Sequence, residues 1–243
     1  MSRDSLTLIS IETSTELASV ALLHEGRLSS RESMGAQTHS STVPGMIQDL
    51  LKEAGVKLSH CDAVAFGAGP GSFTGVRTAC GLAQGLAFGA NIPVVPVITL
   101  LAMAQRARAQ SGNETSDVLS LLDARMGEVY WAQYRFESRN GEAGSEGHWT
   151  VVTEPFLSAA VAVAAEGHPT LCGNGLSAYG GDLLHLQARE QRPEIMPHAT
   201  DVLKLAIAAV REGQTLPARD AQPLYLRNKV ALTTRERQSG VAA

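Results

Sequence analysis

The stretch GAGPGSFTGVR, residues 67–77, separates a short apolar run from a longer run of small residues, and this change of pattern decides the fold class. The apolar run, Ala63–Phe66, has the length and composition of a buried strand. The following run, Phe73–Phe88, indicates a helix rich in small residues. Four glycines within the nine positions 67–75 allow the backbone to turn tightly between the two elements. We therefore expect a strand, a glycine-rich turn and a helix in this order.

The segments on either side of this unit extend the same architecture. Upstream, short strands joined by tight turns are expected at Leu6–Ile11, Leu17–Leu23 and Arg27–Glu32. Apolar residues then recur at spacings of three and four over Ser40–Ala54, which predicts an amphipathic helix. Downstream, Pro93–Ile98 indicates a strand, and Thr99 is expected to cap a helix that runs through Arg108. Strands alternating with helices predict an α/β layer architecture.

The second half repeats the strand-then-helix pattern, which fits a duplicated fold. The polar segment 110–116 marks the boundary, so we expect one domain over residues 1–110 and a smaller one over 111–234. In the second domain, Asp117–Asp123 and Glu128–Phe136 indicate a strand pair, and Glu137–Gly147 an exposed loop. Pro155–Ala165 and Ala199–Glu212 are predicted to be helices. The polar tail, 235–243, is expected to be disordered.

Composition narrows the class of protein. The chain has 243 residues, 44% of them hydrophobic and 18% charged, which is ordinary for a soluble globular protein. Its net charge of −4 argues against a protein that binds RNA on its own, because phosphate contacts need a basic surface. The scattered cysteines, at 61, 80 and 172, indicate buried free thiols in a reducing cytosol. With neither a signal peptide nor a run of ~20 apolar residues, we expect a cytoplasmic protein without a membrane span.

Two segments could bind a small anionic ligand, and each has a simpler structural interpretation. The turn Glu12-Thr13-Ser14-Thr15 could hold a hydrated cation and phosphate oxygens, or its hydroxyls could satisfy loose backbone groups. The glycine-rich segment 67–77 could present a helix N-terminus, capped by Ser72 or Thr74, to an anion. It matches neither a P-loop nor GxGxxG. Small residues at 75, 79 and 83, and at 81, 85 and 89, fit close helix packing instead.

The remaining polar residues do not form a metal or catalytic pattern. His39 and the other histidines are isolated, without HxxxH or HExxH spacing, so no metal centre is expected. The segment 123–131 places two acids, an arginine and two aromatic residues within nine positions. We interpret it as a hairpin with an ion pair at its turn and aromatic side chains that cover a sheet.

Taken together, several segments resemble the TsaB (YeaZ) family, in the expected order and over nearly the whole chain. They are ETST at 12–15 with ASVAL at 18–22, His39, GPGSFTGVR at 69–77, DARMGEVYWA at 123–132, GNG at 173–175 and PLYLRN at 223–228. The glycine-rich block and the Asp-Ala-Arg block are highly specific as a pair. One departure is Glu12, where the family usually has aspartate.

The resemblance implies a two-lobed fold of the actin, sugar kinase and Hsp70 (ASKHA) superfamily, with duplicated ribonuclease H-like lobes. It also implies a non-catalytic scaffold subunit that supports TsaD, its paralogue, in transferring threonylcarbamoyl to the adenosine next to the anticodon of tRNAs that read ANN codons. The implied partners are TsaD, TsaE and, only through the complex, tRNA; alone, the chain should form a homodimer. In TsaD-like proteins two metal-binding histidines follow the glycine loop, whereas the corresponding stretch here, 97–104, has no histidine, acid or cysteine.

These arguments give the residues that we expect to form a cofactor site or a partner interface. We expect no catalytic residue and no cofactor of the chain's own, with any ATP or ADP at the complex interface bound mainly by partners. A vestigial cofactor site is predicted at Thr13, Ser14, Gly69, Gly71 and Ser72. The partner interface is predicted on the two helices, at Met46, Leu50, Thr74, Gly75, Ala79 and Ala83. Two alternatives remain open: a weak ATPase or protease-like enzyme of the same superfold, and a self-associating regulatory protein.

Overall fold

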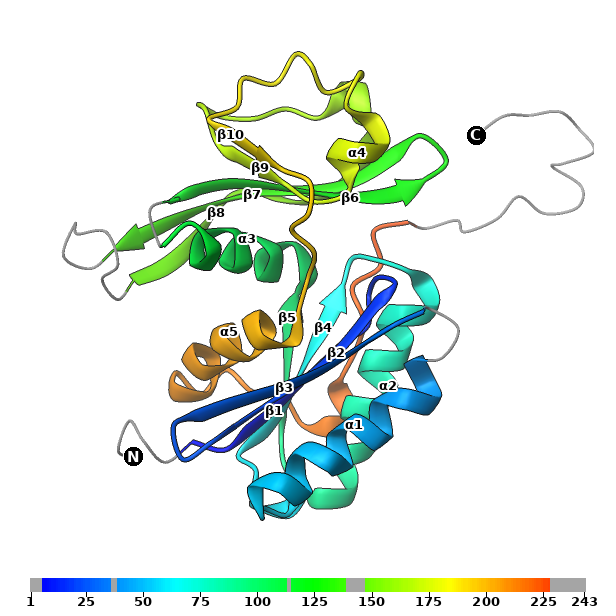
Figure 1. Ribbon diagram of the computed structural model, residues 1–243, viewed down its shortest axis with the longest axis vertical. Coiled ribbons are helices and arrows are strands. Elements are labelled where there is room, and N and C mark those ends of the chain that lie inside the picture. Colours follow the sequence, from blue (N-terminus) through cyan, green and yellow to red (C-terminus); the bar gives the residue numbers. More distant parts are fainter. Residues whose placement is uncertain (1–5, 36–38, 113–114, 139–146, 228–243) are drawn as a thin grey trace, which may run out of the picture.

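The computed structural model describes residues 6–35, 39–112, 115–138 and 147–227, which form two lobes (Figure 1). The first lobe contains a five-stranded sheet in the order β3-β2-β1-β4-β5. Its strands are β1 (Leu8–Glu12), β2 (Leu17–His24), β3 (Arg27–Met34), β4 (Ala63–Gly69) and β5 (Val94–Ile98). The first three strands form an antiparallel meander, and β1, β4 and β5 run parallel. The strand–turn–helix unit around residues 67–77 is confirmed.

Two long helices, α1 (His39–Ala54) and α2 (Phe73–Ala90), cover one face of this sheet. Their apolar residues pack on Ile9, Val20 and Phe66 of the strands, as the spacing of three and four predicted. Helix α2 ends at Asn91, which adopts φ 54° and so supplies the left-handed residue that commonly ends helices. The opposite face is covered by α5 (Ala199–Arg211), through residues that include Val202, Leu203 and Ala206.

The second lobe repeats the first sheet with the equivalent order β10-β9-β6-β7-β8. Its strands are β6 (Asp117–Arg125), β7 (Glu128–Ser138), β8 (Gly147–Ala159), β9 (Thr170–Cys172) and β10 (Glu190–Arg192). Again the first three strands are antiparallel and the rest are parallel, so the predicted duplicated α/β fold is confirmed. One sheet face packs on α3 (Thr99–Gln110). The other is covered by the segment 160–188, which contains the short helix α4 (Gly175–Tyr179).

One prediction about the second half is wrong, and the bounds of another are corrected. The segment Pro155–Ala165 is not a helix: β8 continues to Ala159, and only a single 3-10 turn, Ala160–Ala162, follows. Its pairing with β7 brings Phe156 against Trp131, and this long-range contact overrides the helix propensity of the small residues. Of the predicted loop Glu137–Gly147, residues 139–146 lie outside the described residues, whereas its ends belong to β7 and β8.

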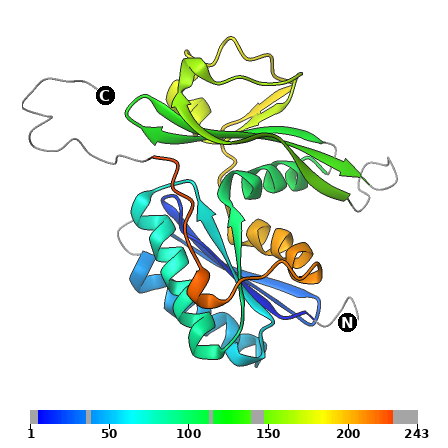
Figure 2. The same cartoon turned by 180° about the vertical axis from the view of Figure 1, so that it is seen from behind.

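The division into residues 1–110 and 111–234 also needs correction, because the helices cross between the lobes. Helix α3 belongs to the first range but packs on β6 and β7, and α5 belongs to the second range but packs on β1 and β2. After α5 the chain stays on the first lobe, where a 3-10 turn at Ala218–Asp220 contacts α2 (Figure 2). Local periodicity identifies a helix but does not specify which sheet it covers. The predicted tail, 235–243, lies outside the described residues.

The states of the three cysteines agree with the sequence analysis. Cys61, Cys80 and Cys172 are buried free thiols, and burial raises the pKa of the Cys61 thiol to about 11 and of the Cys172 thiol to about 12. Thiols with such high pKa values stay protonated and unreactive at neutral pH.

Within the described ranges, no helix combines the length and the apolar character that a membrane crossing requires.

Candidate functional site

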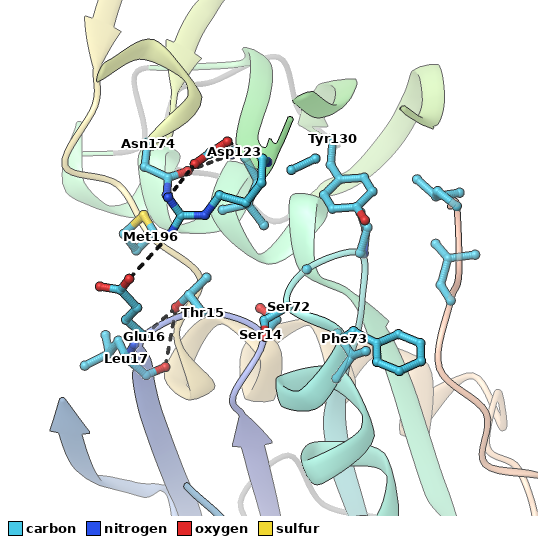
Figure 3. Close-up of a pocket in the computed structure, with 18 of the residues that line it drawn as sticks. Ser14, Thr15, Glu16, Leu17, Ser72, Phe73, Asp123, Tyr130, Asn174 and Met196 are labelled. Carbon is cyan, nitrogen blue, oxygen red and sulfur yellow. Dashed lines mark hydrogen bonds and ion pairs between the residues drawn. The ribbon is translucent and has the colours of Figure 1, made fainter. Parts of the chain in front are cut away.

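A cleft of about 760 Å³ lies between the two lobes (Figure 3). The first lobe contributes the turn after β1, the glycine-rich connection before α2, and Met34 at the end of β3. The second lobe contributes Asp123 and Arg125 from the β6–β7 hairpin, Asn174, and the segment that leads to α5. The C-terminal segment Leu224–Arg227 lines one side of the cleft. The cleft thus combines all the polar segments that the sequence singled out, except His39.

Three of the five predicted cofactor residues meet at the first-lobe wall of the cleft. The Ser72 amide donates to the Ser14 carbonyl oxygen at 2.7 Å, and a Cβ added to Gly71 would lie 2.6 Å from the Ser14 Cβ. Ser72 is the N-cap of α2, so the first turn of this helix faces the cleft. The Ser14 hydroxyl is buried near the Glu12 carboxylate and makes no hydrogen bond of ordinary geometry with the described residues. This corner of the cleft could accept a small anion.

The other two predicted cofactor residues do not line the cleft. The Thr13 hydroxyl donates to the Gly75 carbonyl oxygen at 2.7 Å, and a Cβ on Gly75 would lie 2.0 Å from the Thr13 carbonyl oxygen. The Gly69 amide donates to the Thr99 Oγ1 at 3.1 Å. Both residues therefore hold the first turn of α2 and the end of β4 against their neighbours. At these positions the hydroxyls bond to backbone groups and Gly75 allows close packing, as the simpler structural interpretation expected.

Glu12 points away from the cleft into the first lobe. Its side chain is fully buried against Gly67, where a Cβ would lie only 1.9 Å from the carboxylate. Its Oε1 accepts a hydrogen bond from the Ser14 amide at 2.6 Å, and its Oε2 lies 3.5 Å from the Thr99 hydroxyl. Burial raises the pKa of this carboxyl above its ordinary value. Thr99 therefore contacts Glu12 and Gly69 rather than capping α3, whose N-cap is Ile98.

The positive charges of the cleft are already paired with carboxylates. Arg125 lies 3.2 Å from Asp123 Oδ2 and 3.6 Å from Glu16 Oε1, across the cleft. Arg106 lies 3.2 Å from Asp201 Oδ2, and Arg227 contacts Glu128. Since each arginine that lines the cleft has an acidic partner, binding a triphosphate would require breaking existing ion pairs.

The hairpin predicted at 123–131 is confirmed, including its ion pair. Asp123 Oδ1 accepts hydrogen bonds from the Arg125 amide at 2.7 Å and from the Tyr179 hydroxyl at 2.8 Å. Asn174 Oδ1 accepts from the Asp123 amide at 2.9 Å, which joins this hairpin to α4. Trp131 covers the sheet as expected, with its indole N–H on the Ser158 hydroxyl at 2.9 Å.

Three charged residues of the cleft, Glu16, Arg106 and Glu194, were missed by the sequence reasoning. Glu16 directly follows the segment 12–15. Arg106 lies on α3 and Glu194 follows β10, so only the folded chain brings them together. No spacing in the sequence connects them with the turn after β1. Asp123, Asn174 and Arg227 lie in blocks that carry the family resemblance, which is the signal that could have identified them.

His39 connects two elements of the first lobe. Its Nε2–H donates to the Thr15 carbonyl oxygen at 2.9 Å, and the residue begins α1. It therefore fixes the turn after β1 to the first helix. Among the residues that the structure describes, no three His, Cys, Asp or Glu side chains gather as the ligands of a metal ion would.

The predicted interface residues need a correction. Gly75, Ala79, Ala83 and Leu50 are buried in the core between the helices and their own sheet, and Met46 is half-buried. Only Thr74 is exposed. The three small residues, Gly75, Ala79 and Ala83, pack α2 onto its own lobe, which was the alternative interpretation.

A different set of residues forms the outward surface of α2. Phe73, Arg77, Gly81, Gly85 and Phe88 are exposed and follow one another at spacings of three and four, so they lie on one side of the helix. A Cβ added at Gly81 or Gly85 would meet nothing within 4 Å. The side chain of Phe88 is 78% exposed. We call this set the α2 stripe; it has an aromatic residue at each end and glycines in the middle.

Comparisons with known proteins agree with the resemblance. The family model for TsaD, tRNA N6-adenosine threonylcarbamoyltransferase, matches residues 33–152. The tRNA threonylcarbamoyladenosine biosynthesis protein TsaB of Escherichia coli (strain K12) is 37% identical over 228 residues, covering 93% of this chain and 96% of that protein. TsaB of Haemophilus influenzae is 36% identical over 237 residues, covering 93% of this chain and 95% of that protein.

The fold is also similar to that of a solved relative. The structure of YeaZ from Pseudomonas aeruginosa aligns with a TM-score of 0.82 and 38% sequence identity, covering 91% of this chain and 100% of that chain. The two equivalent five-stranded sheets accordingly form the two-lobed, actin-like fold. Because curated relatives match over nearly their full length, the chain belongs to the TsaB (YeaZ) family.

Proposed function

We propose that this chain is a non-catalytic subunit that binds TsaD and supports it in transferring threonylcarbamoyl to the tRNA adenosine next to the anticodon. The family membership supports a role in threonylcarbamoyladenosine biosynthesis. The observation that carries the non-catalytic part is the state of the two acids beside the turn after β1: Glu12 is buried away from the cleft, and Glu16 lines the cleft but pairs with Arg125. The paired arginines of the cleft support the same conclusion.

The surface that meets TsaD is the outward side of α1 and α2, centred on the α2 stripe. Gly81 and Gly85 let another helix approach closely, while Phe73 and Phe88 can bury apolar surface at either end. Gly45 on α1 is also open. The match to the TsaD family model, residues 33–152, includes both helices. A TsaD molecule would therefore present related helices, and the two proteins would pair with approximate two-fold symmetry.

The same geometry predicts how the chain behaves alone and in the complex. Without TsaD, two copies should pair through the α2 stripe, because a self-complementary patch favours a two-fold dimer.

With a net charge of −4, the chain should contact tRNA only as part of the complex. TsaE joins the assembled complex, and any ATP or ADP is bound mainly by the partners. Ser14, Gly71 and Ser72 are then the remnant of an anion site. The complex works in the cytoplasm.

The proposal is tested by reconstitution of the tRNA modification. Purified TsaD, TsaE, tRNA and the threonylcarbamoyl donor are combined with and without this chain, and threonylcarbamoyladenosine is measured by mass spectrometry of digested tRNA. We expect product only when the chain is present. Equal product formation without the chain would overturn the proposal. ATP hydrolysis by the chain alone, measured in parallel, should stay at background, and rapid hydrolysis that Glu12→Gln abolishes would favour the ATPase alternative instead.

A further inference from the structure

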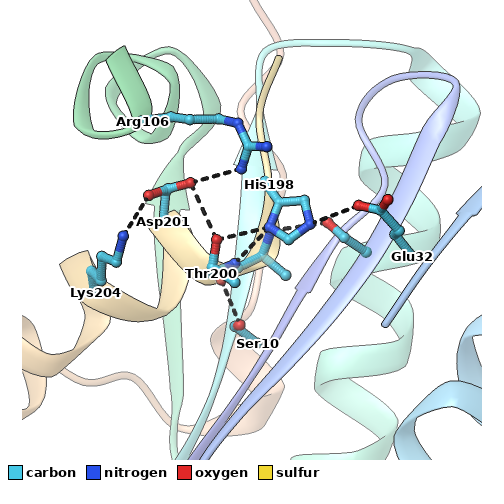
Figure 4. A network of polar contacts seen from close by, with 9 residues as sticks. Ser10, Glu32, Arg106, His198, Thr200, Asp201 and Lys204 are labelled. Carbon is cyan, nitrogen blue, oxygen red and sulfur yellow. Dashed lines mark hydrogen bonds and ion pairs between the residues drawn. The ribbon is translucent and has the colours of Figure 1, made fainter. Parts of the chain in front are cut away.

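The two lobes are joined on one side by a pair of packed helices. The chain passes from the first lobe to the second between β5 and α3, and returns between β10 and α5. Where α3 meets the start of α5, Arg106 pairs with Asp201, which also binds Lys204 at 3.1 Å (Figure 4). His198, the N-cap of α5, lies 3.3 Å from Glu32 of β3. Any opening of the cleft must pivot about this side, because both chain crossings lie here.

The C-terminal segment Pro223–Arg227 lies on the other side of the cleft, where it runs up along α2 toward the second lobe (Figure 2). We call this segment the strap. On the first lobe, the Leu224 amide donates to the Ala68 carbonyl oxygen at 2.7 Å. Arg77 of α2 donates from Nε to the Tyr225 hydroxyl at 2.7 Å, and its guanidinium lies 3.6 Å from the Phe73 ring centroid. These contacts hold the strap to the start of α2.

On the second lobe, the strap ends at the β6–β7 hairpin. The Arg227 guanidinium contacts the Glu128 carboxylate and lies 3.9 Å from the Met126 sulfur. Leu226 packs against the apolar cluster beneath α3. The hairpin that carries Glu128 turns tightly, with φ 63° at Arg125 and 59° at Met126, so it projects its tip toward the strap. Within five residues the strap therefore contacts both lobes.

We propose that the strap is a clasp that holds the lobes at their observed separation. The contacts on the α3–α5 side lie near the pivot and resist opening only weakly, whereas the strap lies across the open side, where a small rotation separates the lobes most. Breaking the Arg227–Glu128 contact should release the hairpin from the strap while leaving both lobes folded. The clasp also joins α2, whose outward side carries the α2 stripe, to the second lobe.

The test measures the distance between the lobes in the full chain. Spin labels are placed at Lys57→Cys in the first lobe and Leu184→Cys in the second, both exposed positions. The natural cysteines are buried and should not react with the label. Pulsed electron spin resonance then gives the distribution of label distances. We expect one narrow peak for the parent chain, and a broader peak shifted to longer distance for Arg227→Glu.

Charge reversal and a matched control make the result specific. Glu128→Arg combined with Arg227→Glu should restore the narrow peak, because the ion pair is re-formed with reversed charges. Arg219→Glu, which changes an exposed arginine that precedes the strap and whose side chain pairs with its neighbour Asp220, should leave the peak unchanged. An unchanged peak in both Arg227→Glu and Tyr225→Ala would overturn the clasp. Should Arg227→Glu fail to fold, the peak of Tyr225→Ala, which removes the hydrogen bond from Arg77 and the ring contact with Phe73, decides the matter.

Discussion

The two lobes have equivalent sheets but different helices outside them. On the first lobe, α1 and α2 are 16 and 18 residues long and form a continuous helical surface. At the corresponding positions of the second lobe, a three-residue 3-10 turn and the five-residue α4 lie within an irregular segment. Exposed glycines in open space with an exposed phenylalanine beside them are found on α2. This difference is the reason for which we propose the partner surface on the first lobe.

The acids near the ends of β1 and β6, the first strands of the two sheets, also differ between the lobes. Glu12 ends β1 and is buried within its own lobe, whereas Asp123, near the end of β6, lines the cleft and pairs with Arg125. In a working phosphate site, both lobes would offer charge to a ligand in the cleft. Here Glu12 is turned inward and Asp123 is paired with Arg125, which supports our proposal that the chain is a non-catalytic subunit.

The largest expected effect separates the buried side of α2 from its outward side. Ala83→Trp places a large ring in the fully buried core under α2 and should cost about 3 kcal/mol or more of the free energy of unfolding. For a chain of this size, that lowers the Tm by roughly 10 °C. Thermal melting followed by circular dichroism measures it. Gly85→Trp, on the open side of the same helix, is the control and should melt within about 2 °C of the parent chain. Equal losses in both variants would contradict the assignment of the two sides.

The next effect concerns binding through the α2 stripe. Gly85→Arg adds a charged side chain where we expect a partner helix to approach, and should raise the Kd for TsaD at least about tenfold, or ~1.4 kcal/mol. Its Tm should stay the same or rise, since arginine is a better helix former than glycine by up to about 1 kcal/mol. Isothermal titration calorimetry measures the affinity. Gly181→Arg, the same change at an exposed glycine of the second lobe, is the matched control and should bind normally. Weaker binding by both variants would show that the lobes do not differ as partner surfaces.

A smaller effect compares the acids of the two lobes through pH. Because burial raises the pKa of Glu12, its contribution to stability is largest below the ordinary value of 4.5 and is lost as the pH rises through the raised pKa. Glu12→Gln stays neutral and can still accept the hydrogen bond from the Ser14 amide, so stability should fall less between pH 4.5 and 8 than in the parent chain. Chemical denaturation at several pH values measures this.

Asp123→Asn is the matched change in the second lobe. It should cost only about 0.5 kcal/mol at neutral pH, because it weakens an ion pair with a largely exposed arginine. Should Glu12→Gln show the same pH profile as the parent chain, the buried state of Glu12 would be refuted.

The smallest effect concerns the junction at which α5 returns to the first lobe. Burial, followed by the nearby Arg106, lowers the pKa of His198, which also faces Glu32 and Asp201. The stability that neutral His198 supplies is therefore lost as the pH falls through its ordinary value of 6.5. His198→Asn keeps a side-chain acceptor for the Thr200 amide but does not titrate. The variant should lose less stability than the parent chain between pH 7 and 5, and a greater loss would contradict this account.

Much of the first lobe could be predicted from the sequence, because its helices are long and periodic. The helix expected over Phe73–Phe88 extends only two residues further, and that expected over Ser40–Ala54 starts one residue earlier. The second lobe was harder, because its cover consists of short segments without a repeat. Pro155–Ala165 has the small residues of a helix, but the pairing of Phe156 with Trp131 of β7 extends β8 instead. That contact depends on residues far apart in the chain.

The residues of the candidate site could likewise be predicted only where local sequence determines their positions. The motif placed Ser14, Gly71 and Ser72 together, since they lie in adjacent turns. It did not reveal that Glu12 and Thr13 both point inward, because β1 passes into a turn at these residues, and the sequence does not tell which side chains of a turn face the cleft. It also did not distinguish the buried small residues, Ala79 and Ala83, from the exposed Gly81 and Gly85. That distinction depends on which side of α2 the sheet occupies.

The most direct test of the central claim measures the initial rate of threonylcarbamoyladenosine formation in the reconstituted system with three variants of this chain. Gly85→Arg alters the α2 stripe, Ser14→Ala alters the wall of the cleft, and Glu12→Gln alters the buried acid behind that wall; we call the last two the cleft variants. At a limiting concentration of the chain, we predict that Gly85→Arg lowers the rate at least about tenfold, in step with its weaker binding to TsaD. The two cleft variants should keep most of the rate. Normal activity of Gly85→Arg together with loss of activity in Glu12→Gln would contradict the account, because the first-lobe surface would then be dispensable and the cleft essential.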